Sequence, residues 1–188
     1  MKRNANHRHG HFMRTMTLFR GIFLCLACAV AMQTFNPMRV SAASQDATDA
    51  SEAIRRQFSP LLSEYSRLFM GGGEADCIDF AVKQNMVSPG LKELLLKEAR
   101  FREKSQEVGH LDFDFFFNAQ DSDGKPLSIV SITKAGDTYL MKVSNGFPGE
   151  KPYDFLLVND SGRWVIDDVR YFVQGAEPTT LRKILTTD

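Results

Sequence analysis

The stretch from Leu127 to Tyr171 constrains the fold more than any other part of this chain, because its apolar residues recur at every second position in short runs. Alternation of this kind is typical of β-strands that bury one face. Turn-forming residues separate the runs, and together they predict four strands, at 127–133, 138–144, 153–158 and 163–172. The short connections between these strands favour an up-and-down antiparallel meander.

The last predicted strand changes its alternation in the middle. Trp164 and Ile166 share one parity, Val169 has the other, and two adjacent acidic residues lie between them. One extra residue on this strand would return Val169 to the buried face. The sequence therefore predicts a β-bulge there, and a bulge would also curl the sheet.

Residues 1–42 read as a secretory signal peptide. They hold six of the 23 basic residues of the chain and none of its 23 acidic residues. The apolar run at 21–32 is shorter than the roughly 20 residues that cross a bilayer, and small residues at 40–42 fit the rule for signal-peptide cleavage. We therefore expect a periplasmic or secreted protein with no membrane span in the mature chain. Lipidation of Cys28 is the alternative.

Composition excludes several classes of function. Removal of the leader would leave the rest of the chain with a net charge of about −6. Nucleic-acid phosphates require a basic surface, so we expect no nucleic-acid partner. Cys77 alone of the three cysteines lies outside the leader, which leaves no internal disulfide to form. No spacing typical of a metal or cofactor site is present, and we expect neither.

Before the meander, apolar residues recur at intervals of three and four, which predicts helices. We expect a frayed polar start and the beginning of a helix at 43–57, an end of that helix at Gly71, and shorter helices at 74–84 and 89–104. Ser88 and Pro89 are residue types preferred at an N-cap and a first helical turn. Residues 58–188 are thus predicted to form one α+β domain, with N-terminal helices packed on a curved four-stranded antiparallel meander.

Two segments carry a resemblance to a known family. The stretch from His110 to Asp121, followed by a meander that ends with the run from Gly162 to Val169, resembles the bacterial DUF3828 family over roughly residues 58–171. This resemblance implies an exported protein with an NTF2-like or cystatin-like α+β fold and no established activity. It carries over no catalytic residue.

Acidic and amide side chains crowd the segment before the first predicted strand, among four phenylalanines. If this segment is extended, alternate phenylalanines would enter the core while Asp112 and Asp114 face the other way. The polar side chains then either tie the segment to the sheet backbone or meet a ligand at the rim of the open end of the sheet. The candidate ligand-binding residues are Asp112, Asp114, Asn118, Gln120, Asp121, Arg170 and Tyr171.

The inward-facing positions of the predicted strands hold no pair of residues suited to catalysis, which favours a small non-enzymatic binding module. Its ligand would be a protein or a cell-envelope component. Two alternatives stay open: a cavity lyase or isomerase that uses Asp114 or His110, and an immunity-like protein that binds a toxin. Apolar residues on the second sheet face, including Leu156 and Val158, favour a homodimer that buries them.

Overall fold

The computed structural model describes residues 38–71, 75–105, 108–121, 125–172 and 175–187. Residues 1–37 of the predicted leader therefore lie outside the described residues. Residues 38–42, its last five, form the start of the first helix. The elements follow in this order: α1 (Met38–Met70), α2 (Cys77–Lys83), α3 (Pro89–Ser105), β1 (Ser128–Ala135), β2 (Thr138–Ser144), β3 (Tyr153–Asp160), β4 (Arg163–Tyr171), β5 (Thr179–Thr180) and α4 (Leu181–Thr186).

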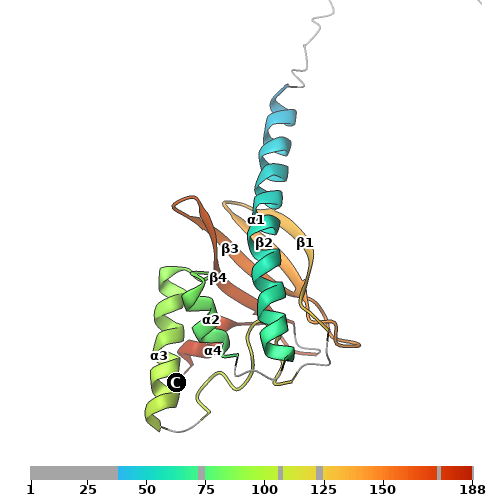
Figure 1. Cartoon of the computed structure of the whole chain (residues 1–188). Helices are drawn as coiled ribbons and strands as arrows, with labels where there is room; N and C mark the ends of the chain where they lie inside the picture. Colours follow the sequence, from blue (N-terminus) through green and yellow to red (C-terminus); the bar gives the residue numbers. More distant parts are fainter. Residues whose placement is uncertain (1–37, 72–74, 106–107, 122–124, 173–174, 188) are drawn as a thin grey trace, which may run out of the picture. The chain divides into compact units, whose positions relative to one another are not determined.

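The strands form one antiparallel sheet in the order β1-β2-β3-β4-β5, which confirms the α+β meander (Figure 1). The expected number of strands was wrong by one. A fifth strand, β5, places Thr180 opposite Arg170 and Thr179 opposite Tyr171. A strand of two residues is too short to show alternation, so only its pairing with β4 in the folded chain reveals it.

The bulge in β4 is confirmed. Ile166 lies opposite Leu157 and Asp168 lies opposite Leu156, which leaves Asp167 as the extra residue. After the bulge, Val169 returns to the buried face and is fully buried. The parity change read from the sequence is therefore the position at which the sheet bends.

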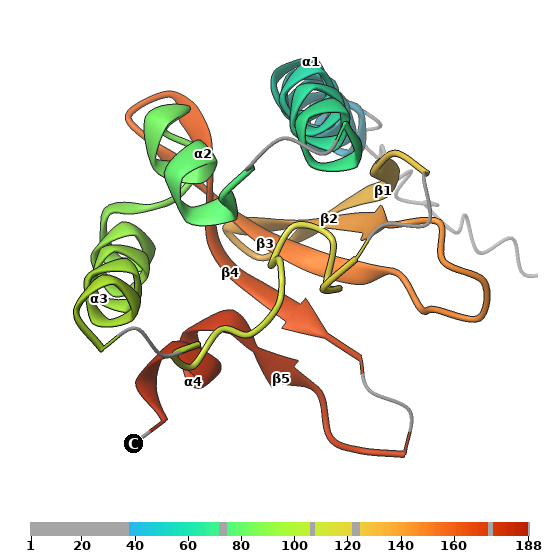
Figure 2. The same ribbon diagram turned by 60° about the horizontal axis from the view of Figure 1, so that its bottom comes forward.

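Helices α1 and α2 lie on one side of the sheet (Figure 2). The inward stripe of α1 has the spacing of a helix face, and its four members are 1% exposed or less: Ile54, Phe58, Leu62 and Tyr65. The helix begins at Met38, and the stretch around 44–51 that we expected to be frayed is helical. Alanines recur through that stretch, and alanine has the highest helix propensity of all residues. The helix propensity of these alanines thus has a larger effect than the polar side chains, from which we had expected a frayed segment.

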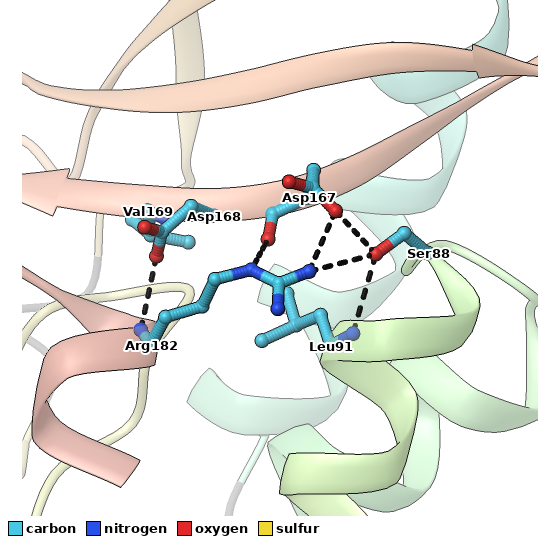
Figure 3. Close-up of polar contacts among 6 residues, drawn as sticks. All are labelled: Ser88, Leu91, Asp167, Asp168, Val169 and Arg182. Carbon is cyan, nitrogen blue, oxygen red and sulfur yellow. Dashed lines mark hydrogen bonds and ion pairs between the residues drawn. The ribbon is translucent and has the colours of Figure 1, made fainter. Parts of the chain in front are cut away.

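A polar cluster at the β4 bulge joins three distant parts of the chain (Figure 3). The Arg182 guanidinium donates to the Asp167 carbonyl and carboxylate, both at 2.6 Å, and to the Ser88 hydroxyl at 3.3 Å. The Ser88 hydroxyl also accepts the backbone N–H of Leu91 at 3.2 Å, which confirms Ser88 as the N-cap of α3. Asp168 accepts the backbone N–H of Arg182 at 3.0 Å. The two acids of the bulge therefore fix α3 and α4 to β4.

Arg182→Ala is expected to lower the free energy of unfolding by about 2–4 kcal/mol, because it removes three hydrogen bonds, two of them to the half-buried Asp167. Urea denaturation followed by circular dichroism measures this loss. Lys183→Ala, on the exposed side of the same short helix, is the matched control and should change stability by less than about 0.5 kcal/mol. Equal losses in the two variants would contradict the role given to this cluster.

The opposite face of the sheet is mixed. Leu156 and Val158 are half-buried there, next to Asp154, which is 6% exposed and lies 4.0 Å from Lys142. The homodimer that would cover this face stays a prediction. Among the described residues no helix has the length and hydropathy needed to span a bilayer.

Candidate functional site

The segment 111–119 is a compact turn and is not extended. The Asp114 N–H donates to the Ala119 carbonyl at 2.9 Å, and Asn118 closes the turn with a φ of 52°. The three phenylalanines at 115–117 are all fully buried, so they do not alternate between core and solvent. The alternate faces that an extended segment would give these residues are therefore not present.

Asp114 holds this turn together. Its Oδ1 accepts the backbone N–H groups of Phe116 and Phe117, each at 2.9 Å, and its Oδ2 accepts the hydroxyl proton of Tyr65. The Asp114 side chain points into the protein and the residue is 8% exposed. Short acidic side chains commonly bind backbone N–H groups two or three positions ahead in this way. Asp114 therefore does not take the outward orientation that an extended segment would give it.

Side chains from the sheet satisfy the carbonyl groups of the same turn. The Tyr171 hydroxyl donates to the Phe115 carbonyl at 3.3 Å, the Tyr153 hydroxyl donates to that of Phe116, and the Asn145 amide donates to that of Phe117 at 2.7 Å. Buried carbonyls require such partners, because an unsatisfied one is unfavourable by about 1–3 kcal/mol. Tyr171 is 2% exposed and thus does not lie at a rim, contrary to the sequence-based expectation.

Glu98 is a buried acid that our sequence analysis missed. Its Oε1 accepts the backbone N–H of His110 at 2.9 Å and that of Leu111 at 3.1 Å, while its Oε2 lies 3.0 Å from His110 Nδ1. Glu98 is 3% exposed and follows Leu91 and Leu95 at helical spacing. That spacing could have identified it as an inward-facing position of α3.

Gly109 makes the contact between Glu98 and its two N–H donors feasible. A Cβ at this position would lie 2.2 Å from Glu98 Oε1, and the φ of 76° is one that side chains disfavour. His110, the candidate base, is thereby fixed through Nδ1, and its ring packs on Phe101 with the centroids 5.7 Å apart.

A pocket of about 620 Å³ opens beside this turn. Three of the predicted ligand-binding residues line it: Asp112, Asp114 and Gln120. Four do not, since Asn118, Asp121, Arg170 and Tyr171 are absent from its walls. The remaining described residues of the lining are Phe69, Ala75, Asp76, Cys77, Arg102, Val108, Leu111 and Phe113.

Arg170 and Tyr171 lie on opposite faces of β4. Arg170 is exposed and lies across from Asp154, on the face that points away from the buried turn. Adjacent residues of a strand always point to opposite sides of the sheet. The structure therefore separates these two candidates, which we had placed together at one rim.

The pocket carries an excess of negative charge. Asp76, Asp112 and Asp114 contribute carboxylates, and the one guanidinium of the described lining, Arg102, already lies 3.4 Å from Asp76. Asp112 is exposed and forms no ion pair with another described residue. The Nε of Arg102 is buried without a hydrogen-bond partner in the described part of the chain.

Burial determines the protonation of the groups behind the pocket. It raises the pKa of Asp114 to about 6, although the Tyr65 hydroxyl and the two backbone N–H groups act in the opposite direction. Burial also raises the pKa of Tyr65 and that of the Cys77 thiol. The negative charge of Asp114 raises both pKa values further. Cys77 is therefore a protonated, unreactive thiol.

The raised pKa of Asp114 has a measurable effect on stability. In the unfolded chain its pKa is close to 3.8, against about 6 in the folded protein. The contribution of protonated Asp114 to the free energy of unfolding is therefore fully present below pH 3.8. It falls by about 3 kcal/mol in total as the pH rises through about 6.

Asp114→Asn removes this pH dependence but keeps an acceptor for the two N–H groups. The difference in unfolding free energy, variant minus wild type, should therefore rise by about 2.5 kcal/mol between pH of about 4 and about 7. Urea denaturation at the two pH values measures it, and a constant difference would contradict the burial effect.

No group of three or more histidine, cysteine, aspartate or glutamate residues with the geometry of a metal site is present in the described ranges. The site that the structure presents is thus an acidic pocket with an apolar part, built on a turn whose polar groups are engaged within the protein. Comparison of this chain with protein-family models, with curated proteins and with solved structures finds no match.

Proposed function

We propose that this chain is an exported, non-enzymatic binding module whose ligand enters the pocket beside the 111–119 turn. The observation that carries the proposal is the lining of that pocket, where the exposed Asp112 and Gln120 stand next to Val108, which is 66% exposed. A concave site of about 620 Å³ that combines apolar side chains with a few polar groups is typical of ligand pockets.

The chemistry available in the pocket supports binding over catalysis. A general base needs a free lone pair within hydrogen-bonding reach of substrate. Asp114 accepts three hydrogen bonds from the protein and is 8% exposed, and His110 is absent from the described lining of this pocket. The Asp114 carboxylate is used to hold the turn, which leaves recognition to Asp112 and Gln120.

The charge of the pocket favours a ligand with a positively charged group. The described part of its lining holds three carboxylates and one guanidinium, which is already paired with Asp76. Complementary charge speeds association and selects partners. We propose a basic segment of a protein or a basic cell-envelope component that also presents an apolar group to Val108.

Capture of the ligand from the periplasmic extract of the native host tests this proposal. Asp112→Asn and Gln120→Ala should each reduce capture about tenfold, because they alter the exposed polar part of the lining. Asp121→Asn is the matched control, since Asp121 is exposed on the same segment but lies outside the lining. Equal capture by all three variants, with unchanged melting temperatures, would refute the proposed site.

A cavity enzyme remains the second candidate, because a pKa of about 6 suits an acid or base at neutral pH and Asp114 lines the pocket. The two functions differ in their response to Asp114→Asn. An enzyme would lose activity by several orders of magnitude, whereas a binding module would still capture its ligand.

The compartment and the fold family belong to the same proposal. The basic, acid-free leader and the small residues at 40–42 support export, and an antiparallel meander covered by helices is compatible with the NTF2-like family of the resemblance. Intact-mass measurement of the protein from its native host should show removal of residues 1–42. Recovery of the uncleaved chain from the cytoplasm would contradict export.

A further inference from the structure

Strand β1 is an open edge of the sheet within the described residues, since it pairs with β2 and with no other strand. Its first half is irregular, because the register shifts between Ile129 and Ser131. From Ser131 to Ala135 the pairing with β2 is regular. An unpaired regular edge of this kind can accept a further strand.

The register shows which backbone groups of β1 point outward. Ala135 and Thr138 flank a two-residue turn that begins at Gly136, with a φ of 64°, so these two residues form a hydrogen-bonded pair. Residues alternate along an antiparallel ladder between pairs that exchange hydrogen bonds and pairs that do not. The N–H and C=O groups of Ile132 and Lys134 therefore point away from β2 and towards the open edge.

A second pocket lies beside the same edge. It has a volume of about 430 Å³ and lies between α1 and β1, which run close together in the fold (Figure 1). Ile132, Thr133 and Lys134 line it from the strand, and Ile132 and Lys134 share the helix-covered face with their partners Met141 and Tyr139. The described residues that line it from α1 are Ala47, Thr48, Ser51, Glu52 and Arg55.

We propose that this edge binds an extended segment of a partner protein, which adds as a strand to β1 and places an acidic side chain in the pocket. The backbone groups of Ile132 and Lys134 would pair with the added strand. Side chains of that strand that point towards α1 would enter the pocket, whose described lining holds two cations, Arg55 and Lys134, and one acid, Glu52. A carboxylate is the side chain that this combination selects.

A second copy of this chain fits the edge less well. The sequence of β1, Ser-Ile-Val-Ser-Ile-Thr-Lys-Ala, contains a lysine and no acid, so a paired β1 would bring a like charge and no carboxylate to the pocket. The proposal thus commits to a foreign strand with an acidic residue, and it does not depend on the ligand proposed for the pocket beside the 111–119 turn.

The probe is a synthetic, fluorescently labelled peptide of about eight residues, close to the usual length of a strand. It alternates threonine and valine, with one central valine replaced by glutamate. Fluorescence anisotropy should show binding to the folded protein. A peptide with lysine in place of the glutamate should bind about tenfold more weakly, and one with N-methylated backbone amides should not bind.

Two variants of the protein separate backbone pairing from charge. Lys134→Pro removes the outward N–H at an edge position where proline is tolerated, and it should abolish binding without a change in melting temperature. Lys134→Thr keeps the N–H and should keep binding but lose the preference for glutamate over lysine.

Equal binding of the N-methylated and unmethylated peptides would overturn the proposal, and so would full binding by Lys134→Pro. The N-methylated peptide keeps the test decisive if Lys134→Pro does not fold. Concentration-dependent dimerisation that Lys134→Pro removes, without any peptide binding, would instead assign the edge to a second copy of the chain.

Discussion

Asp114→Ala is expected to lower the free energy of unfolding by about 3–5 kcal/mol at a pH of about 4, where protonated Asp114 contributes most, and this is the largest effect that we expect from one substitution. The change leaves the backbone N–H groups of Phe116 and Phe117 and the Tyr65 hydroxyl without their acceptor inside the core. Urea denaturation monitored by circular dichroism measures the loss. Since the marginal stability of a domain is only about 5–15 kcal/mol, part of the variant should be unfolded near body temperature.

Asp112→Ala is the control for this prediction, because Asp112 is an exposed acid two positions earlier. Its unfolding free energy should stay within about 0.5 kcal/mol of the wild type. Asp114→Asn should fall between the two alanine variants, since its amide oxygen still accepts the two N–H groups. A similar loss for Asp112→Ala and Asp114→Ala would show that the turn is not held by the Asp114 carboxylate.

Glu98→Ala is expected to destabilise the protein by about 2–4 kcal/mol, because the N–H groups of His110 and Leu111 lose their acceptor and a cavity forms beside Gly109. The measurement is thermal unfolding, in which we expect the melting temperature to fall by about 5–15 °C. Glu93→Ala provides the control on the exposed side of the same helix. A melting temperature equal to that of the Glu93→Ala variant would mean that solvent replaces Glu98 without loss.

Local rules in the sequence were enough to predict several parts of the fold. The alternation in the meander placed β1 to β4, the parity change placed the bulge at the two acids between Ile166 and Val169, and residue type identified Ser88 as an N-cap. Each of these features depends on residues close in sequence or on the geometry of a single strand. β5 and α4 were not predicted, because their position depends on the contacts of Arg182 with β4.

The candidate site was harder to predict for a related reason. The polar residues around the three phenylalanines were recognised as needing partners, but those partners lie far away in the chain. Tyr65 precedes Asp114 by 49 residues, and Tyr171 follows Phe115 by 56. Alternation over a few residues cannot reveal such contacts, so the inward orientation of Asp114 was missed.

The order of these contacts along the chain has a consequence for folding. During synthesis of the chain, residues 115–117 leave the ribosome before Asn145, Tyr153 and Tyr171. Those three later residues donate the hydrogen bonds to the carbonyl groups of residues 115–117. Until the meander has formed, the aromatic side chains of residues 115–117 have only part of their core, the earlier rings of Tyr65, Phe69 and Phe80. Non-local contacts of this kind form slowly, and exposed apolar segments aggregate in the meantime. We therefore expect refolding yield to fall steeply with protein concentration, and a nascent chain that is interrupted before Tyr171 to require a chaperone.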